Sequence, residues 1–320
     1  MTLSDIADRR QLRRKLTFWR ILAFLVLAAA IVALWAAMNG GELSNPRGRD
    51  HIARISITGV IQDDADLLDR LNSVAKNKAA KGLIVSINSP GGTTYGGEAI
   101  YKAIRKVAAN KPVVSDVRTL AASAGYMVAI AGDRIVAGDT SITGSIGVIY
   151  QYPQIKGLLD KLGVSMEEIK SAPLKAEPSP FHPAPEGAKE AMRAMLMDTF
   201  DWFVDLVAER RKLDRAEALA LSDGRVFSGR QAVELKLVDA IGGSEQIRDY
   251  FAELKVDRNL PIVEWPRASG GGSLLFGRAA ETALNAIGLD WLANALSLRN
   301  ISEDKLLLDG LVSVWQVDGN

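Results

Sequence analysis

The chain is predicted to fold as an α/β protein whose strands pair largely in parallel. Short apolar runs of strand character alternate with longer segments of helical spacing, which is typical of consecutive strand–helix units. The run Gly82–Asn88 is almost continuously apolar, as expected for a strand that is buried on both faces. With 320 residues, the chain is long enough for one large domain or two.

The elements are predicted in order from residue 51. Strands are expected at 51–58, 82–88, 112–118, 134–137, 145–150 and 261–265, and helices at 64–78, 95–109, 126–131 and 188–211. The long helix 188–211 is expected to turn one face inward, made of Met192, Met195, Leu196, Phe203 and Leu206. Asp214–Glu217 has the pattern of a capping box, and Ser228 and Ser244 can cap later helices.

The N-terminus has the pattern of a membrane anchor. Residues 21–38 are all apolar and would span about 27 Å as a helix, close to the hydrocarbon core of about 30 Å. Residues 1–20 are rich in arginine, so the positive-inside rule predicts a cytoplasmic segment there. Residues 39–50 form a polar linker. A cleaved signal peptide is the alternative, but the apolar run is long and the cleavage site is poor.

Composition excludes several classes of function. The absence of cysteine excludes thiol catalysis, thiolate metal sites and disulfides. The net charge of +1 gives no indication of nucleic-acid binding. Histidine occurs only at His51 and His182, so a multi-histidine metal site is not expected, and no cofactor is expected either.

Ser123 is the first candidate catalytic residue. It lies among small residues in Leu120–Tyr126, between a predicted strand and a predicted helix. A helix N-terminus favours developing negative charge, and small neighbours allow a substrate to approach a nucleophilic serine. The alternative is a structural role, in which Ser123 only caps the helix.

A second glycine-rich loop, Asn88–Gly92, follows the predicted strand 82–88. Because ligands bind at the carboxyl ends of parallel strands, this loop and Ser123 can face the same crevice. Backbone N–H groups of Gly91 or Gly92 and of Ala124 could then form an oxyanion hole. An ordinary Pro-Gly turn is the structural alternative, and the pattern of a phosphate-binding loop is absent.

A serine nucleophile needs a proton acceptor, and four residues are candidates. His51 precedes the first strand and is expected to be a surface residue, and His182 lies in a proline-rich loop. Lys170 or Lys175 could serve if burial lowered the pKa of the amine. The residues alone leave the choice between these lysines open.

Five motifs in order resemble one family. They are Asn88–Gly92, Ala121–Tyr126, Thr143–Ile149, Ile169–Lys175 and Asp223–Arg230. Together they resemble the signal peptide peptidase SppA family in its short, single-repeat form, over roughly residues 51–250. The resemblance implies a ClpP/crotonase-like fold and a Ser-Lys dyad of Ser123 and Lys175. It also implies that Ser145 orients the lysine and that Gly92 and Ala124 donate to the oxyanion. One departure is Ala124, where many members have glycine.

The resemblance also implies an organisation and a function. Residues 51–255 would form the peptidase domain, and residues 256–320 a C-terminal extension of uncertain structure. The chain would be a single-pass protein of the inner (plasma) membrane, with the peptidase domain outside the cytoplasm. It would cleave remnant signal peptides as a homo-oligomer, with an octamer expected, and bind no nucleic acid. The alternatives are a related peptidase for other membrane or misfolded proteins, and an inactive membrane-tethered scaffold. An acyl-CoA enzyme is the least favoured alternative, since a domain outside the cytoplasm would meet no CoA.

Overall fold

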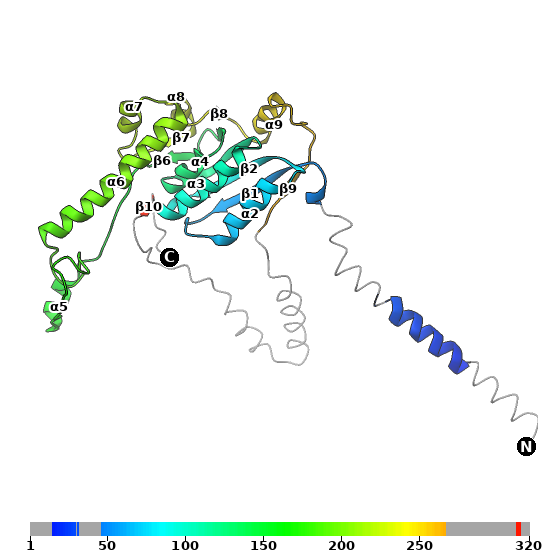
Figure 1. Cartoon of the computed structure of the whole chain (residues 1–320), viewed down its shortest axis with the longest axis horizontal. Coiled ribbons are helices and arrows are strands. Elements are labelled where there is room, and N and C mark those ends of the chain that lie inside the picture. The colour runs from blue at the N-terminus through cyan, green and yellow to red at the C-terminus, as the bar shows by residue number, and fades with distance from the viewer. Residues whose placement is uncertain (1–14, 30, 32–45, 267–311, 315–320) are drawn as a thin grey trace, which may run out of the picture. The chain divides into compact units, whose positions relative to one another are not determined.

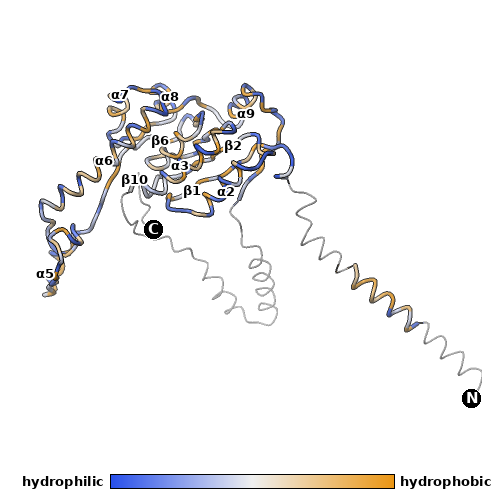
Figure 2. Tube along the Cα trace, in the orientation of Figure 1, coloured by the Kyte–Doolittle hydropathy of each residue, from blue (hydrophilic) through white to orange (hydrophobic). Residues whose placement is uncertain are grey.

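The computed structural model describes residues 15–29, 31, 46–266 and 312–314 of a chain that divides into two compact units, Met1–Arg49 and Asp50–Asn320. In the first unit, residues 15–29 form an exposed and mostly hydrophobic helix (Figure 2). Within the described ranges, no helix has both the length and the apolar character needed to cross a bilayer. The predicted transmembrane segment 21–38 lies partly outside these ranges.

A mainly parallel sheet forms the centre of the second unit (Figure 1). Its strands run in the order β7-β6-β4-β2-β1-β9, and β5 joins it by pairing with β4 and β8. All of these pairs are parallel except β6 with β7. The strands are β1 (His51–Thr58), β2 (Ala80–Ser89), β4 (Val113–Ala122), β5 (Arg134–Ala137), β6 (Ile142–Gly144), β7 (Val226–Ser228), β8 (Ala240–Ile241) and β9 (Ile262–Glu264).

Two further short strands form a small antiparallel sheet. Strand β3 (Gly91–Thr93) leaves the end of β2, and strand β10 (Val312–Val314) pairs with it. The 3-10 helix η1 (Pro46–Gly48) precedes β1, and most strand connections contain a helix. The helices are α2 (Ala65–Lys76), α3 (Thr94–Ala108), α4 (Ala124–Ala129), α5 (Lys156–Leu162), α6 (Glu186–Arg211), α7 (Arg215–Ala220), α8 (Gly229–Glu234) and α9 (Ser244–Glu253).

Local sequence signals explain where the helices begin. Asp64 caps α2 by accepting a hydrogen bond from the Leu67 N–H group at 3.0 Å. Asp214 and Ser228 cap α7 and α8 in capping boxes, as predicted. Ser244 is instead the first residue of α9, whose N-cap is Gly243.

The core lies on both faces of the sheet, which explains the apolar strands. Leu83, Val85 and Ile87 of β2 pack into the large cluster that includes residues of α2, α3 and α4. The intervening Ile84 faces the opposite side and packs with Phe251 of α9. Burial on both faces is the rule for parallel strands, and the predicted α/β class is confirmed.

The predicted strand at 145–150 is wrong. The structure places strand β6 three residues earlier, at Ile142–Gly144, and the backbone of Ser145 then turns with φ of +50°. A positive φ is incompatible with a continuing strand. The apolar run that follows therefore leaves the sheet instead of extending it.

The N-terminal half of α6 also differs from the prediction. Phe203 and Leu206 are buried, but Met195 is exposed and Met192 and Leu196 are only partly buried. This half of α6, together with α5 and the segment 163–185 that joins them, projects from the body as an arm (Figure 1). The arm, defined as residues 156–200, carries exposed apolar side chains at Leu158, Leu162, Val164, Met166, Ile169, Leu174, Met195 and Met197.

Candidate active site

Ser123 lies at the junction of β4 and α4. Its backbone N–H group donates to the Gly144 carbonyl of the neighbouring strand at 2.8 Å. Its φ of +59° and ψ of −119° are unusual for a residue with a side chain. The residue is only 1% exposed. Strained conformations of this kind are common at functional sites, where the surrounding structure holds them in place.

The glycine-rich loop reaches the same edge of the sheet. Ser89, the last residue of β2, pairs with Ala121 of β4, so Gly91 and Gly92 leave the sheet beside Ser123. Gly92 cannot carry a side chain, because a Cβ atom there would meet the Ile61 carbonyl oxygen at 1.9 Å. Ala124 is the first residue of α4, where a backbone N–H group has no acceptor within the helix. The two predicted oxyanion donors therefore flank Ser123 from two elements.

Ser145 comes to this edge from a third strand. Ala122 pairs with Gly144, so the residues that follow them, Ser123 and Ser145, leave adjacent parallel strands together. The Ser145 N–H group donates to the Arg225 carbonyl at 2.7 Å, which fixes its turn. The structure thus brings Ser123, Ser145, Gly92 and Ala124 together.

The single chain does not bring Lys175 to this group. The segment 163–185, which contains Lys175, joins α5 to α6 in the arm, away from α4 in the body (Figure 1), and Lys175 is exposed. Among the described residues, no hydrogen bond joins Lys175 to Ser123. Lys170 contacts the carboxylates of Glu168 and Glu177, and hydrogen bonds to them raise the pKa of Lys170. Lys170 therefore stays protonated near neutral pH and is a poor proton acceptor.

Neither histidine is a candidate base. The prediction that His51 lies at the surface is wrong, since it is fully buried and stacks on Trp265 with ring centroids 6.1 Å apart. His51 begins β1 and so lies at the amino edge of the parallel sheet, whereas Ser123 follows a carboxyl end. His182 has both ring nitrogens engaged, since Nε2 lies 2.8 Å from the Glu168 carboxylate and Nδ1 lies 3.2 Å from the Pro183 carbonyl oxygen.

The pairing of strand β10 with β3 is a feature of the site that the sequence did not indicate. Its Ser313 pairs with Gly92, and the strand also contacts α4, the helix that follows Ser123. Three residues of alternating type are too short a pattern to predict a strand. Addition of an extended segment to a strand edge is a recurrent way in which proteins bind peptides. The pairing shows that the edge of β3 accepts an extended chain.

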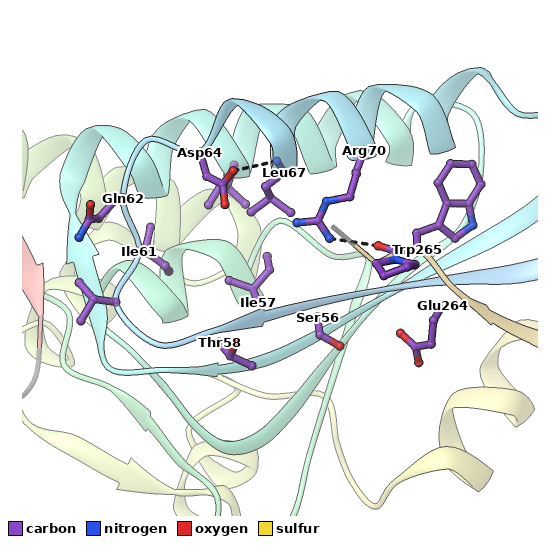
Figure 3. Close-up of a pocket in the computed structure, with 13 residues that line it drawn as sticks. Ser56, Ile57, Thr58, Ile61, Gln62, Asp64, Leu67, Arg70, Glu264 and Trp265 are labelled. Carbon is purple, nitrogen blue, oxygen red and sulfur yellow. Dashed lines mark hydrogen bonds between the residues drawn. The ribbon is translucent and has the colours of Figure 1, made fainter. Parts of the chain in front are cut away.

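A pocket of about 430 Å³ lies elsewhere in the body, between β1, α2 and the segment after β9 (Figure 3). Arg70 of α2 donates to the Trp265 carbonyl at 3.0 Å across it. None of the predicted catalytic or oxyanion residues lines this pocket. Ile61 lines the pocket and also connects it to the glycine-rich loop, because the Ile61 N–H group donates to the Gly91 carbonyl at 2.8 Å.

Comparison with known proteins gives two family matches. The model of peptidase family S49 matches residues 105–257, which include Ser123, Ser145 and Lys175. The Clp protease model matches residues 51–141, in agreement with the expected ClpP-like α/β fold.

Three relatives extend these matches. A protein of Enterococcus faecium, whose name places it with the signal peptide peptidases SppA, is 34% identical over 234 residues, covering 69% of this chain and 68% of that protein. A protein of Synechocystis sp., named as a protease, is 35% identical over 262 residues, covering 78% and 93%. "Serine protease SPPA, chloroplastic" of Arabidopsis thaliana is 29% identical over 279 residues, covering 85% and 39%.

Proposed function

Since this chain belongs to peptidase family S49 and is a serine peptidase, we propose that Ser123 is its nucleophile and Lys175 its general base. The convergence of three strand ends on Ser123 carries the assignment of the nucleophile. The lysine is supported by elimination within the described residues. Lys170 is held in ion pairs, His182 has both ring nitrogens engaged by Glu168 and the Pro183 carbonyl, and His51 lies at the opposite edge.

In this mechanism, the neutral amine of Lys175 takes the proton of the Ser123 hydroxyl as its oxygen attacks the substrate carbonyl. The N–H groups of Gly92 and Ala124 stabilise the negative charge that develops on the carbonyl oxygen. Ser145 orients the lysine amine. The lysine then gives its proton to the leaving amine, and water releases the acyl group from Ser123 by the reverse sequence of proton transfers.

We infer that the substrate binds as an extended strand along β3. The pairing of β10 with β3 supports this inference, since it places an extended segment directly beside Gly92. A peptide in the same position would present its carbonyl groups to the N–H groups at this edge. This binding mode uses main-chain hydrogen bonds and therefore tolerates many side chains.

The lysine is proposed to come from a neighbouring copy of the chain in a homo-oligomer, with an octamer expected. Two observations support a shared site. The arm carries the Lys175 segment away from α4 of its own body, and its apolar side chains are exposed in the single chain. A contiguous apolar surface on a projecting element is typical of an interface. Packing of the arm on a neighbouring chain would bury these apolar side chains and would also bring Lys175 close to the neighbour's Ser123.

We propose that the chain is anchored in the plasma membrane by residues 21–38 and acts outside the cytoplasm on remnant signal peptides. The apolar run, the basic residues before it, and the name of the Enterococcus relative support this. A reporter that is active only outside the cytoplasm, fused after residue 50, should be active. A silent reporter on a stable fusion would exclude this orientation.

Substitution of the dyad tests the assignment. Ser123→Ala and Lys175→Ala should each abolish cleavage of a quenched fluorescent peptide with a signal-sequence core, without unfolding the body. Lys161→Ala removes another exposed lysine of the same arm and should leave turnover unchanged. Ser145→Ala should lower turnover less than loss of the dyad. Full activity in either dyad variant would overturn the assignment.

A further inference from the structure

The loop that carries Lys175 is closed at its base by four charged side chains: Glu168, Lys170, Glu177 and His182. The Lys170 ammonium contacts the carboxylates of both Glu168 and Glu177, the first at 2.6 Å. His182 Nε2 lies 2.8 Å from the Glu168 Oε1 atom and 3.2 Å from the Glu177 Oε1 atom. This group is called the charge cluster below. It joins residues that precede Lys175 to residues that follow it.

Glu177 is the anchor of the charge cluster. Its side chain is only 2% exposed, although most of the surrounding segment lies on the surface. One carboxylate oxygen faces Lys170 and His182, and the other accepts the Ser179 N–H group at 3.1 Å. A buried carboxylate is stable only when such partners are present, so removal of Lys170 should release it.

The loop between Lys170 and Glu177 is short and sharply turned. The Lys175 N–H group donates to the Ala172 carbonyl at 3.1 Å, and the Glu177 N–H group to the Leu174 carbonyl at 3.3 Å. Ala176 has a φ of +60°, a left-handed conformation that a residue with a side chain rarely adopts. Such a conformation persists only where surrounding contacts hold it. The contacts that join the two ends of this loop, Lys170 and Glu177, belong to the charge cluster.

The far side of the charge cluster is tied to the start of α5. Gln154 donates to the His182 carbonyl at 2.7 Å, and the Ile155 N–H group donates to the Pro180 carbonyl at 2.9 Å. The loop is therefore fixed to the arm as a whole. Lys175 itself differs from its neighbour Lys170, because no hydrogen bond of its ammonium is found among the described residues.

We propose that Lys170 and Glu177 are positioning residues, whose ion pair holds the loop 171–176 in the shape that presents Lys175 to the serine. The proposal rests on the proposed function, in which Lys175 is the general base. Lys170, which is a poor general base because it is protonated, would act in the reaction through its charge, by holding Glu177. Removal of the ion pair should leave the body and its peptide-binding edge intact and misplace the amine.

A metal ion is the alternative occupant of the charge cluster. Glu168, Glu177 and His182 each offer a ligand atom within 4.8 Å of the others. The Lys170 ammonium already lies against both carboxylates and supplies the positive charge that a metal would bring. Lys170 offsets one of the two carboxylate charges, and His182, whose pKa is raised by hydrogen bonds to the Pro183 carbonyl and Glu168, offsets the other when protonated.

The test uses the full chain and the quenched signal-sequence peptide. Lys170→Met and Glu177→Gln should each lower kcat about 10- to 100-fold, because a misplaced base acts only in the chemical step. KM should change less than about twofold, because the β3 edge is untouched. Lys170→Arg should restore most of kcat, since a guanidinium can bind both carboxylates. A merely structural role would instead lower the unfolding temperature and change kcat and KM together.

Two reference variants separate the possible outcomes. Lys156→Met removes the Lys156–Asp160 ion pair, which lies on the same arm but does not cross the Lys175 loop, and should leave kcat unchanged. Lys175→Ala reports on the dyad itself. If Lys175→Ala remains active, the proposed function fails. If Lys175→Ala is inactive while Lys170→Met and Glu177→Gln turn over like the parent, the positioning role fails and the dyad stands.

Discussion

Two serines at the carboxyl edge of the sheet have backbones in strained regions. Ser123 and Ser145 have φ of +59° and +50°, and such conformations cost roughly 1–3 kcal/mol each. The backbone N–H groups of both residues donate to neighbouring carbonyls, at 2.8 Å to Gly144 and 2.7 Å to Arg225. These hydrogen bonds hold the turns at which the strands end, and they fix where each hydroxyl leaves the sheet.

Gly92 is predicted to tolerate no side chain. In Gly92→Ala, the new methyl group would overlap the Ile61 carbonyl oxygen, a backbone atom that cannot move without displacing its strand bridge. Overpacking of this kind costs about 1–3 kcal/mol of unfolding free energy. If Gly92 is the oxyanion donor, as proposed, its displacement should also lower kcat about 100-fold or more. Denaturant titration and peptide cleavage measure the two effects.

Gly157→Ala is the matched control for this substitution. Gly157 lies in α5, and a Cβ atom there would have no neighbour within 4 Å. Alanine in place of an exposed helical glycine should raise stability by about 0.5–1 kcal/mol and leave kcat unchanged. An equally stable and active Gly92→Ala variant would contradict the close approach of Ile61.

The buried carboxyl group of Asp116 should make the stability of the protein depend on pH. It is buried in β4, and burial raises the pKa of its carboxyl group although Arg118 and Arg54 lower it. A raised carboxyl pKa in the folded state means that stability is fully present below the unfolded pKa and is lost as pH rises through the folded pKa. Asp116→Asn should therefore be more stable than the parent at neutral pH.

The difference between Asp116→Asn and the parent should shrink as pH falls and become small below about pH 3, where aspartate is protonated in both states. Thermal unfolding at a series of pH values measures it. A variant that is less stable than the parent at pH 7 would indicate that the ion pair with Arg118 outweighs burial. Turnover should be unaffected near neutral pH, since Asp116 precedes the site by most of a strand.

Strands with a short apolar run or a regular alternation of apolar residues were predictable. β1 and β5 have the bounds that periodicity predicts, and Ser123 was correctly placed between a strand and a helix. The strand predicted at 145–150 lies instead at Ile142–Gly144, because the chain turns at Ser145, whose N–H group is held by the Arg225 carbonyl far along the chain. His51 was misplaced for the same reason, since its burial depends on Trp265, 214 residues later.

The arm shows that an amphipathic pattern does not identify the surface on which its apolar face packs. Apolar spacing in α6 predicts one inward face, but periodicity does not distinguish the core of the same chain from the surface of a partner. Phe203 packs on the body, whereas Met195 and Met197 remain exposed. The proposed base, Lys175, could be named only from the family resemblance, because the segment 163–185 that carries it lies in the arm, apart from α4 (Figure 1).

The exposed methionines of α6 give a prediction about assembly. Met195→Gln with Met197→Gln should change the unfolding free energy of the body by less than about 0.5 kcal/mol, because these residues lie on the surface of the single chain. The same variant should shift the assembly toward smaller species in light scattering. Glu190→Gln, at another exposed position of α6, is the control. An unchanged assembly would exclude these methionines from the interface.

A site shared between neighbouring chains predicts complementation. A Ser123→Ala chain still supplies Lys175, and a Lys175→Ala chain still supplies Ser123. In a mixed assembly, one of the two neighbour orders restores a complete site. Co-expression of the two inactive variants should therefore recover part of the parental cleavage rate.

The control for complementation is each variant assembled alone, which should remain inactive. Differently tagged chains, purified through both tags in turn, establish that the assemblies are mixed. If such assemblies stay completely inactive, serine and lysine come from the same chain, and the arm must fold back onto its own body.

During synthesis, β1 must wait for one of its partner strands, β9, which is made about 200 residues later. Among the described strands β1 is synthesised first, yet it lies between β2 and β9, and its Ile52 pairs with Ile262 of β9. Until residues 262–265 emerge, one edge of β1 stays unpaired and His51 lacks the Trp265 ring that covers it. An open strand edge is a template for aggregation. Nascent chains that stall before residue 262 should therefore depend on chaperones, and a soluble fragment of the peptidase body needs both His51 and Trp265 inside its boundaries.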